Sequence, residues 1–220
     1  MKVFLIVNFK TYTEATGKNA IKLAKICEKV AKETKTDIRI AVQTADLFSV
    51  SQAISLKVYT QHVDSYETGA HTGSISVSDI KKEGAKGSLL NHSEKRISLK
   101  KIKETIILCK KYKFHLCICV KNPKEAEKLA LFSPHMIAVE PPSLIGGEIS
   151  ITSNPKIILE TIKKVKKHSP TTKILVGAGI KNVEDIKKVV TLGANGVLLS
   201  SHVVLAKNPE KVLRKLASVF

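Results

Sequence analysis

Short apolar runs alternate with longer amphipathic segments along the whole chain of 220 residues. The short runs are nearly continuous in apolar character, which is typical of strands buried on both faces of a parallel sheet. Eight of them predict strands, at residues 2–9, 38–43, 57–62, 87–92, 114–119, 135–140, 173–178 and 196–201. The segments between them predict helices, most clearly at 17–34, 98–112, 123–131, 154–168, 182–192 and 208–218, with shorter ones near 46–55 and 76–83.

Eight sequential β/α units predict one α/β domain over residues 1–220, a compact (β/α)8 barrel of the TIM-barrel type. The length suits a single large core, and no low-complexity segment or linker divides the chain. A doubly wound open sheet is the alternative. It is disfavoured because no G-x-G-x-x-G turn follows the first strand.

The charge of the chain bears on its partners. The formal charge is +18, and nearly all of the excess is lysine, because the only arginines are Arg39, Arg96 and Arg214. Nucleic-acid binders usually rely on arginine, with aromatic side chains between the cations, whereas aromatic residues are 5% here and Trp is absent. We expect a solvated lysine surface that steers anionic substrates, and no specific nucleic-acid partner.

Two further features concern the cellular setting. No apolar run approaches the roughly 18 residues of a membrane span, and no small-residue cleavage site follows the N-terminal run. We therefore expect a cytoplasmic protein without a membrane partner. The cysteines contain no Cys-x-x-Cys pair of the zinc-binding kind, so we expect buried, reduced thiols; they are Cys27, Cys109, Cys117 and Cys119.

Polar residues follow several of the predicted strands. In a barrel of this type the carboxyl ends of all strands lie on one rim, where active sites are found. Strand 1 ends at Asn8 and Lys10, strand 4 at His92 and Glu94, and strand 6 at Glu140. Each residue type alone is more often structural or simply solvated. Together on one rim, a cation, an imidazole and a carboxylate predict a catalytic site.

The residue types suggest a reaction. Glu140 is a candidate base for a proton next to a carbonyl, and the His92 imidazole can polarise the carbonyl oxygen. Lys10 adds positive charge at a bound anion. The segment 141–147 places an apolar tip between two prolines and two glycines, which predicts a lid that excludes water. Small residues with open backbone N–H groups predict a phosphate site after strands 7 and 8, at Gly177, Gly179, Ser200 and Ser201.

A set of segments spread over essentially the whole chain resembles the triosephosphate isomerase family, in its shorter archaeal branch. In order they are NFKTY (8–12), TQHVD (60–64), GAHTGSIS (69–76), NHSEKR (91–96), AVEPPSLIG (138–146), VGAGI (176–180) and GVLLSS (196–201). The resemblance implies interconversion of dihydroxyacetone phosphate and D-glyceraldehyde 3-phosphate, in glycolysis and gluconeogenesis, without metal or organic cofactor.

The resemblance also implies residue roles. In the mechanism generally described for this family, a glutamate, here Glu140, moves a proton between C1 and C2, while a neutral histidine, here His92, acts on the enediolate oxygens. Asn8 and Lys10 would contact the substrate, and Glu94 would position Lys10. The phosphate would be held by backbone near Ile145, Gly146, Gly179, Ser200 and Ser201.

The family likeness further implies a homodimer or homotetramer that associates through loop 67–76, with Thr72 near the neighbour's site. Three residues depart from the family pattern. Glu148 stands where the lid usually ends in glycine, His202 replaces a glycine after strand 8, and Lys95 replaces a common arginine. We expect these departures to affect the rate of the reaction more than its identity.

Two other functions remain open at this point. The chain could be a different aldose–ketose isomerase that shares the phosphate site but prefers a longer sugar. It could also be a non-catalytic RNA-binding protein that uses the charge of +18. The presence of Lys10, His92 and Glu140 together argues against the second.

Overall fold

A closed barrel of eight parallel strands forms the centre of the protein. The computed structural model describes residues 3–142 and 151–219. Each strand pairs with its sequence neighbours, and β8 pairs with β1, so the open sheet is excluded and the (β/α)8 barrel is confirmed. The strands are Phe4–Asn8 (β1), Asp37–Val42 (β2), Lys57–Thr60 (β3), Gly87–Leu90 (β4), His115–Val120 (β5), Met136–Val139 (β6), Lys173–Val176 (β7) and Gly196–Leu199 (β8).

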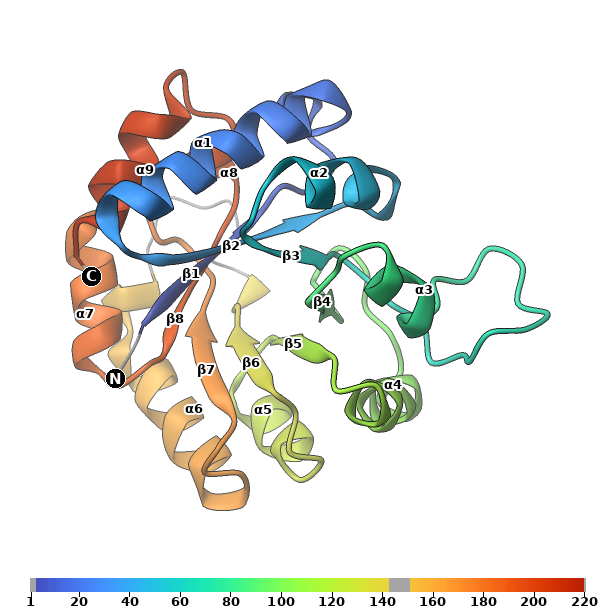
Figure 1. Ribbon diagram of the computed structural model, residues 1–220. Coiled ribbons are helices and arrows are strands. Elements are labelled where there is room, and N and C mark those ends of the chain that lie inside the picture. Colours follow the sequence, from blue (N-terminus) through green and yellow to red (C-terminus); the bar gives the residue numbers. More distant parts are fainter. Residues whose placement is uncertain (1–2, 143–150, 220) are drawn as a thin grey trace.

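Helices surround the barrel and cover the outer face of the sheet (Figure 1). The α-helices of the described ranges are Lys18–Thr34 (α1), Leu47–Ala53 (α2), Val77–Lys82 (α3), Leu99–Lys111 (α4), Pro123–Ala130 (α5), Pro155–His168 (α6), Val183–Thr191 (α7), Ser201–Val204 (α8) and Pro209–Ala217 (α9). Short 3-10 turns lie at Thr13–Ala15 (η1), Thr44–Asp46 (η2) and Ile151–Ser153 (η4). All the predicted helices are present, including the two short ones.

Most predicted strands extended too far at their carboxyl ends, and α8 was missed. Strand β4 stops at Leu90 because Asn91 adopts a positive φ of 58°, which cannot continue a strand. Strand β8 stops at Leu199, and Ser201 begins a helix instead of ending the strand as predicted. Four residues are too few to show a helical period in sequence. At these points the chain turns away from the sheet, and this turn places the side chains that follow each strand on the rim of the barrel.

Two apolar layers account for the continuous hydrophobic character of the strands. Alternate strand residues point into the barrel or outward against the helices. The interior layer consists of Phe4, Ile6, Ala41, Tyr59, Leu89, Cys117, Cys119, Met136, Ala138, Leu175 and Leu198. Both layers include cysteines, and all four thiols are buried and unbridged, which confirms that prediction.

One segment leaves the compact body of the protein. Between β3 and α3 the chain extends far from the barrel (Figure 1), and its tip, residues 67–73, is exposed. The base of this excursion is closed by Asp64, whose backbone N–H donates to the Ile75 carbonyl at 2.9 Å and whose carboxylate accepts the Ile75 N–H at 2.8 Å. None of the helices in residues 3–142 and 151–219 is both long and apolar enough to cross a membrane.

Candidate active site

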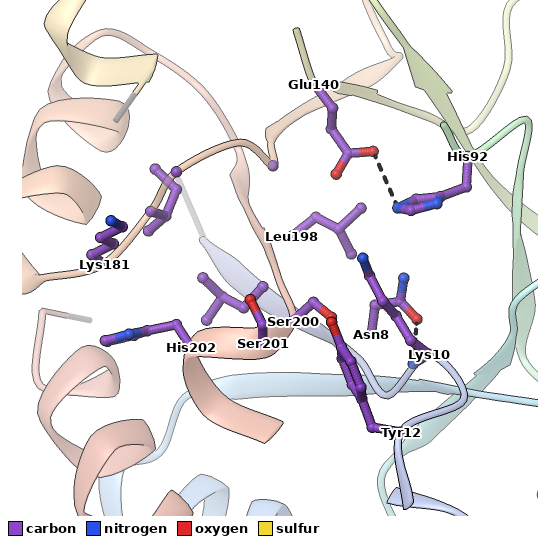
Figure 2. A pocket seen from close by; sticks show the side chains of 14 residues that line it. Asn8, Lys10, Tyr12, His92, Glu140, Lys181, Leu198, Ser200, Ser201 and His202 are labelled. Carbon is purple, nitrogen blue, oxygen red and sulfur yellow. Dashed lines mark hydrogen bonds and ion pairs between the residues drawn. The ribbon is translucent and has the colours of Figure 1, made fainter. Parts of the chain in front are cut away.

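The carboxyl ends of five strands converge on one cavity of about 300 Å³ (Figure 2). Its lining includes eight of the predicted site residues, which are Asn8, Lys10, His92, Glu140, Gly177, Gly179, Ser200 and Ser201. It also includes Tyr12, Lys181 and His202. Four predicted features lie outside the described residues: the phosphate-contacting residues Ile145 and Gly146, the tip of the lid, and Glu148.

Lys10 reaches the cavity from a strained turn after β1. Its φ is 50°, and its backbone is held on both sides, because its N–H donates to Asn8 Oδ1 at 3.0 Å and its carbonyl accepts Gln61 Nε2 at 2.8 Å. The ammonium lies 2.5 Å from Glu94 Oε1. Lys10 is 16% exposed and Glu94 58%, so the carboxylate lies on the solvent side of the pair. The lysine charge is thereby directed over the cavity floor.

The turn after β4 sets the orientation of His92. Asn91 is buried, and its side chain donates to the Cys119 carbonyl at 3.0 Å and accepts the Ile97 N–H at 3.1 Å. Within this turn His92 Nδ1 accepts the backbone N–H of Glu94 at 3.3 Å. The acceptor role of Nδ1 in this bond corresponds to the tautomer with its hydrogen on Nε2, and Glu94 Oε2 also lies 3.5 Å from Nδ1. That N–H lies on the side of Glu140.

Glu140 follows β6 directly and is 6% exposed. Its Oε2 lies 3.9 Å from His92 Nε2, too far for a hydrogen bond, and has no hydrogen-bond partner among the described residues. Burial raises the pKa of Glu140, while His92, a hydrogen bond from Cys119 and Lys10 offset part of that rise. A buried carboxylate oxygen without a partner is costly, and such groups concentrate at functional sites.

Gly177, just after β7, makes room for this carboxylate. A Cβ at this position would lie 2.6 Å from Glu140 Oε1 and 2.7 Å from its Cγ. Those distances are far inside van der Waals contact. Sequence reasoning treated Gly177 only as part of a phosphate turn, because nothing local shows that a residue from another strand faces it.

Gly177→Ala should therefore lower kcat about 10- to 100-fold by displacing the Glu140 carboxylate, since displacements near 1 Å can have effects of that size. The measurement is steady-state kinetics of the reaction catalysed at this site. The same change introduced into a Glu140→Ala protein should cost almost nothing further, because the group that it displaces is gone. An equal loss in both backgrounds would show that Gly177 acts on something other than Glu140.

The far end of the cavity is small and polar. Gly179 has a positive φ of 66°, and Ser200 Oγ is buried without a hydrogen-bond partner among the described residues. Lys181 and His202 lie across the cavity from His92 and Glu140 (Figure 2). Burial and the nearby Lys181 lower the pKa of His202, whose ring bonds the Lys181 backbone. His202 thus lines the site instead of facing away from it.

Comparison with known proteins shows to which family this sequence is related. A sequence model described as triosephosphate isomerase matches residues 3–217. The triosephosphate isomerase of Methanothermus fervidus is 43% identical over 213 residues, with 96% of each chain covered. That of Methanocaldococcus jannaschii is 42% identical over 215 residues, covering 97% of this chain and 98% of the relative. That of Methanosarcina mazei is 36% identical over 214 residues, covering 97% and 96%. The barrel, the rim cavity and these matches agree: the chain is an isomerase that belongs to the triosephosphate isomerase family.

Proposed function

We propose that this protein interconverts dihydroxyacetone phosphate and D-glyceraldehyde 3-phosphate by proton transfer through an enediolate. The observation that carries the proposal is the unpartnered, buried carboxylate oxygen of Glu140, facing the neutral Nε2–H of His92 across 3.9 Å. The substrate pair is suggested by the relatives described above, which are triosephosphate isomerases. A role in glycolysis and gluconeogenesis would follow from that reaction.

Each step uses groups that line the cavity. The Glu140 carboxylate takes a proton from C1 of dihydroxyacetone phosphate, becomes a neutral acid, and leaves an enediolate. It then returns that proton to C2, while the oxygen-bound proton moves from O1 to O2. The His92 N–H stabilises the oxygens as charge develops on them. The carboxylate is regenerated, so a turnover neither consumes nor releases a proton.

Lys10 would stabilise the negative charge of substrate and transition state, with Glu94 as its positioning residue. Lys10→Ala should lower kcat/KM about 10²- to 10³-fold, through both a higher KM and a lower kcat. Lys86→Ala, at an exposed position outside the cavity, is the matched control and should leave both constants unchanged. Kinetics like those of the control would remove Lys10 from the mechanism.

The phosphate would occupy the far end of the cavity, against the backbone of Gly179, Ser200 and Ser201. The unpartnered Ser200 hydroxyl and the cations Lys10 and Lys181 favour an anion there. Ile145 and Gly146 remain predicted contacts from the lid. The family is known for proceeding without metal or organic cofactor, and we propose the same here.

The choice of triose over longer sugars is tested directly by a coupled assay. A cavity of about 300 Å³ is at the small end of ligand sites, which favours a three-carbon substrate. We expect turnover of glyceraldehyde 3-phosphate, inhibition by a phosphate-bearing enediolate mimic, and little turnover of pentose or hexose phosphates. Preference for a longer sugar phosphate would instead support a different aldose–ketose isomerase.

We also propose that the protein self-associates through the projecting loop 67–76. This segment is closed at its base by Asp64 and Ile75, and in its exposed tip His71 stacks on Tyr66 with ring centroids 4.4 Å apart. An ordered loop far from the body suits insertion into a second copy. Sedimentation analysis should give a dimer or tetramer, and a monomer at micromolar concentration would contradict the proposal.

A further inference from the structure

A second cavity lies at the end of the barrel opposite the active site. It encloses about 450 Å³ and is lined by Ile106, Cys109, Lys110, Lys113, Phe114, His115, Leu116, Ser133, Pro134, His135 and Thr171. His115 is the first residue of β5, and His135 immediately precedes β6, so the cavity opens at the amino ends of these strands. The proposed mechanism uses none of these residues.

Two histidines form a stacked pair on its wall. The rings of His115 and His135 are 4.0 Å apart between centroids and tilted by only 10°. Arg39 donates to the Tyr59 hydroxyl at 3.3 Å, and the same hydroxyl shares a hydrogen bond with His115 Nδ1 at 3.1 Å. Among the described residues, no hydrogen bond or ion pair engages His115 Nε2 or either nitrogen of His135.

The charges that face the pair are almost all positive. Arg39 on β2, Lys57 on β3 and Lys173 on β7 contribute this charge from other strands of the barrel. The nearby acid, Asp37, already pairs with Arg39 at 2.7 Å and with Lys57 at 3.2 Å. Burial and these cations lower the pKa of both imidazoles, with His115 itself adding to the effect on His135. No acidic side chain among the described lining residues balances this positive potential.

The cavity offers donors but no carboxylate. Lys110 donates to the Phe132 carbonyl at 2.8 Å, while the Lys113 ammonium and the hydroxyls of Ser133 and Thr171 make no hydrogen bond or ion pair with the described residues. The remaining wall is apolar. Groups of this kind, gathered around an apolar floor, are complementary to an oxyanion attached to a small apolar body.

We propose that this cavity is a second anion site, which binds a phosphate, sulfate or similar oxyanion between the histidine pair and Lys113. The bound anion compensates the positive potential, so an imidazole of the pair takes up a proton when the anion binds. The site is spatially separate from the active site, and it carries no step of the isomerase reaction.

The test is a sulfate titration of the wild-type protein followed by the histidine ring resonances in NMR. Sulfate keeps one charge state over the relevant pH range, so its own ionisation does not confuse the result. We expect saturable shifts of the His115 and His135 signals. We also expect the sulfate affinity to rise about tenfold for each unit by which the pH falls below the bound-state pKa, until the pKa of the free protein is reached. Sulfate binding in the active site is followed separately, as competitive inhibition.

Two variants complete the design. His135→Gln should abolish the saturable shift of His115 but leave kcat, KM and the competitive inhibition constant unchanged. The matched control is His168→Gln, whose imidazole lies beside Glu127 at 3.7 Å outside the cavity and should change nothing. Methylphosphonate and phenylphosphonate share a head group, so comparing their affinities shows whether the apolar floor contributes to binding. Tighter binding of the phenyl compound supports an organic ligand. Equal binding supports a free oxyanion.

Absence of saturable His115 and His135 shifts at millimolar sulfate in the wild-type protein would overturn the proposal, even with full isomerase activity. So would shifts that persist in His135→Gln, or an affinity that is independent of pH. Failure of the isomerase assay is a different outcome and bears only on the function proposed for the rim cavity.

Discussion

Glu140→Gln should lower kcat by about 10³-fold or more while the barrel stays folded. A positioned general base contributes up to about 10⁴-fold, and no other carboxylate lines the described cavity. Glutamine has nearly the same shape and fits beside Gly177, so the loss reports chemistry and not packing. Glu83→Gln, at an exposed position away from the rim, is the control and should be indistinguishable from wild type. Turnover within tenfold of wild type would exclude Glu140 as the base.

The raised pKa of Glu140 gives this variant a second signature. A carboxyl whose pKa is higher in the folded protein than in the unfolded chain destabilises the fold as pH rises from its ordinary value of 4.5 through the folded value. Above the folded pKa the wild-type protein bears that cost in full, whereas glutamine cannot ionise. We therefore expect Glu140→Gln to melt at a higher temperature than wild type near neutral pH, and the difference to vanish toward pH 4.5 and below.

The acid limb of the wild-type pH–rate profile should follow the same group. Because the base acts as a carboxylate, kcat/KM should fall as the pH drops through the raised pKa of Glu140, above the ordinary range of a glutamate. Active-site titration by calorimetry with an enediolate mimic would report the proton bound on the same carboxyl. An acid limb at the ordinary glutamate value would show that the carboxylate is solvated in the working enzyme.

His92→Gln should lower kcat about 10²- to 10³-fold, less than the loss of the base. Removing one preorganised donor at a developing oxyanion has an effect of that size. The Nδ1 atom of His92 accepts the Glu94 N–H, which directs the Nε2–H to the substrate side; a glutamine amide can offer an N–H but not in this fixed orientation. KM should change little, because the bond strengthens mainly in the transition state.

The protonation state of His92 can be measured on its own. Ring nitrogen shifts in NMR should report the hydrogen on Nε2, because Nδ1 accepts the Glu94 N–H. The matched kinetic control is again His168→Gln, which leaves the rim untouched. An imidazolium at neutral pH, or near-normal kcat in His92→Gln, would contradict the electrophile role.

Some of the site could be predicted from residues alone because the barrel converts sequence position into spatial position. The carboxyl end of every parallel strand meets the same rim, so the sequence alone predicts that Lys10, His92 and Glu140 lie together. The details that could not be predicted are contacts between strands. These include the 2.6 Å approach of a Gly177 Cβ to Glu140 and the hydrogen bond of Glu140 with Cys119.

Local geometry also limited the sequence prediction at strand ends. The positive φ of Asn91 ends β4 earlier than its apolar pattern suggested, and that of Lys10 turns the chain just beyond β1, although neither residue is glycine. Both turns are held by side chains, Asn8 for Lys10 and the amide of Asn91 itself. Such bonds are specific to the folded arrangement, so residue type alone gave no sign of them.

The sequence by itself determined the order of strands and helices, the closed-barrel class and the rim that carries the reactive groups. Hydrophobic periodicity is a local property, and parallel connectivity follows from it. Only the tertiary structure decided the tautomer of His92, the burial that raises the pKa of Glu140, and the gathering of His115, His135 and their cations around a second cavity. Those properties depend on distances between residues far apart in the chain, and electrostatic and steric energies are set by distance in space.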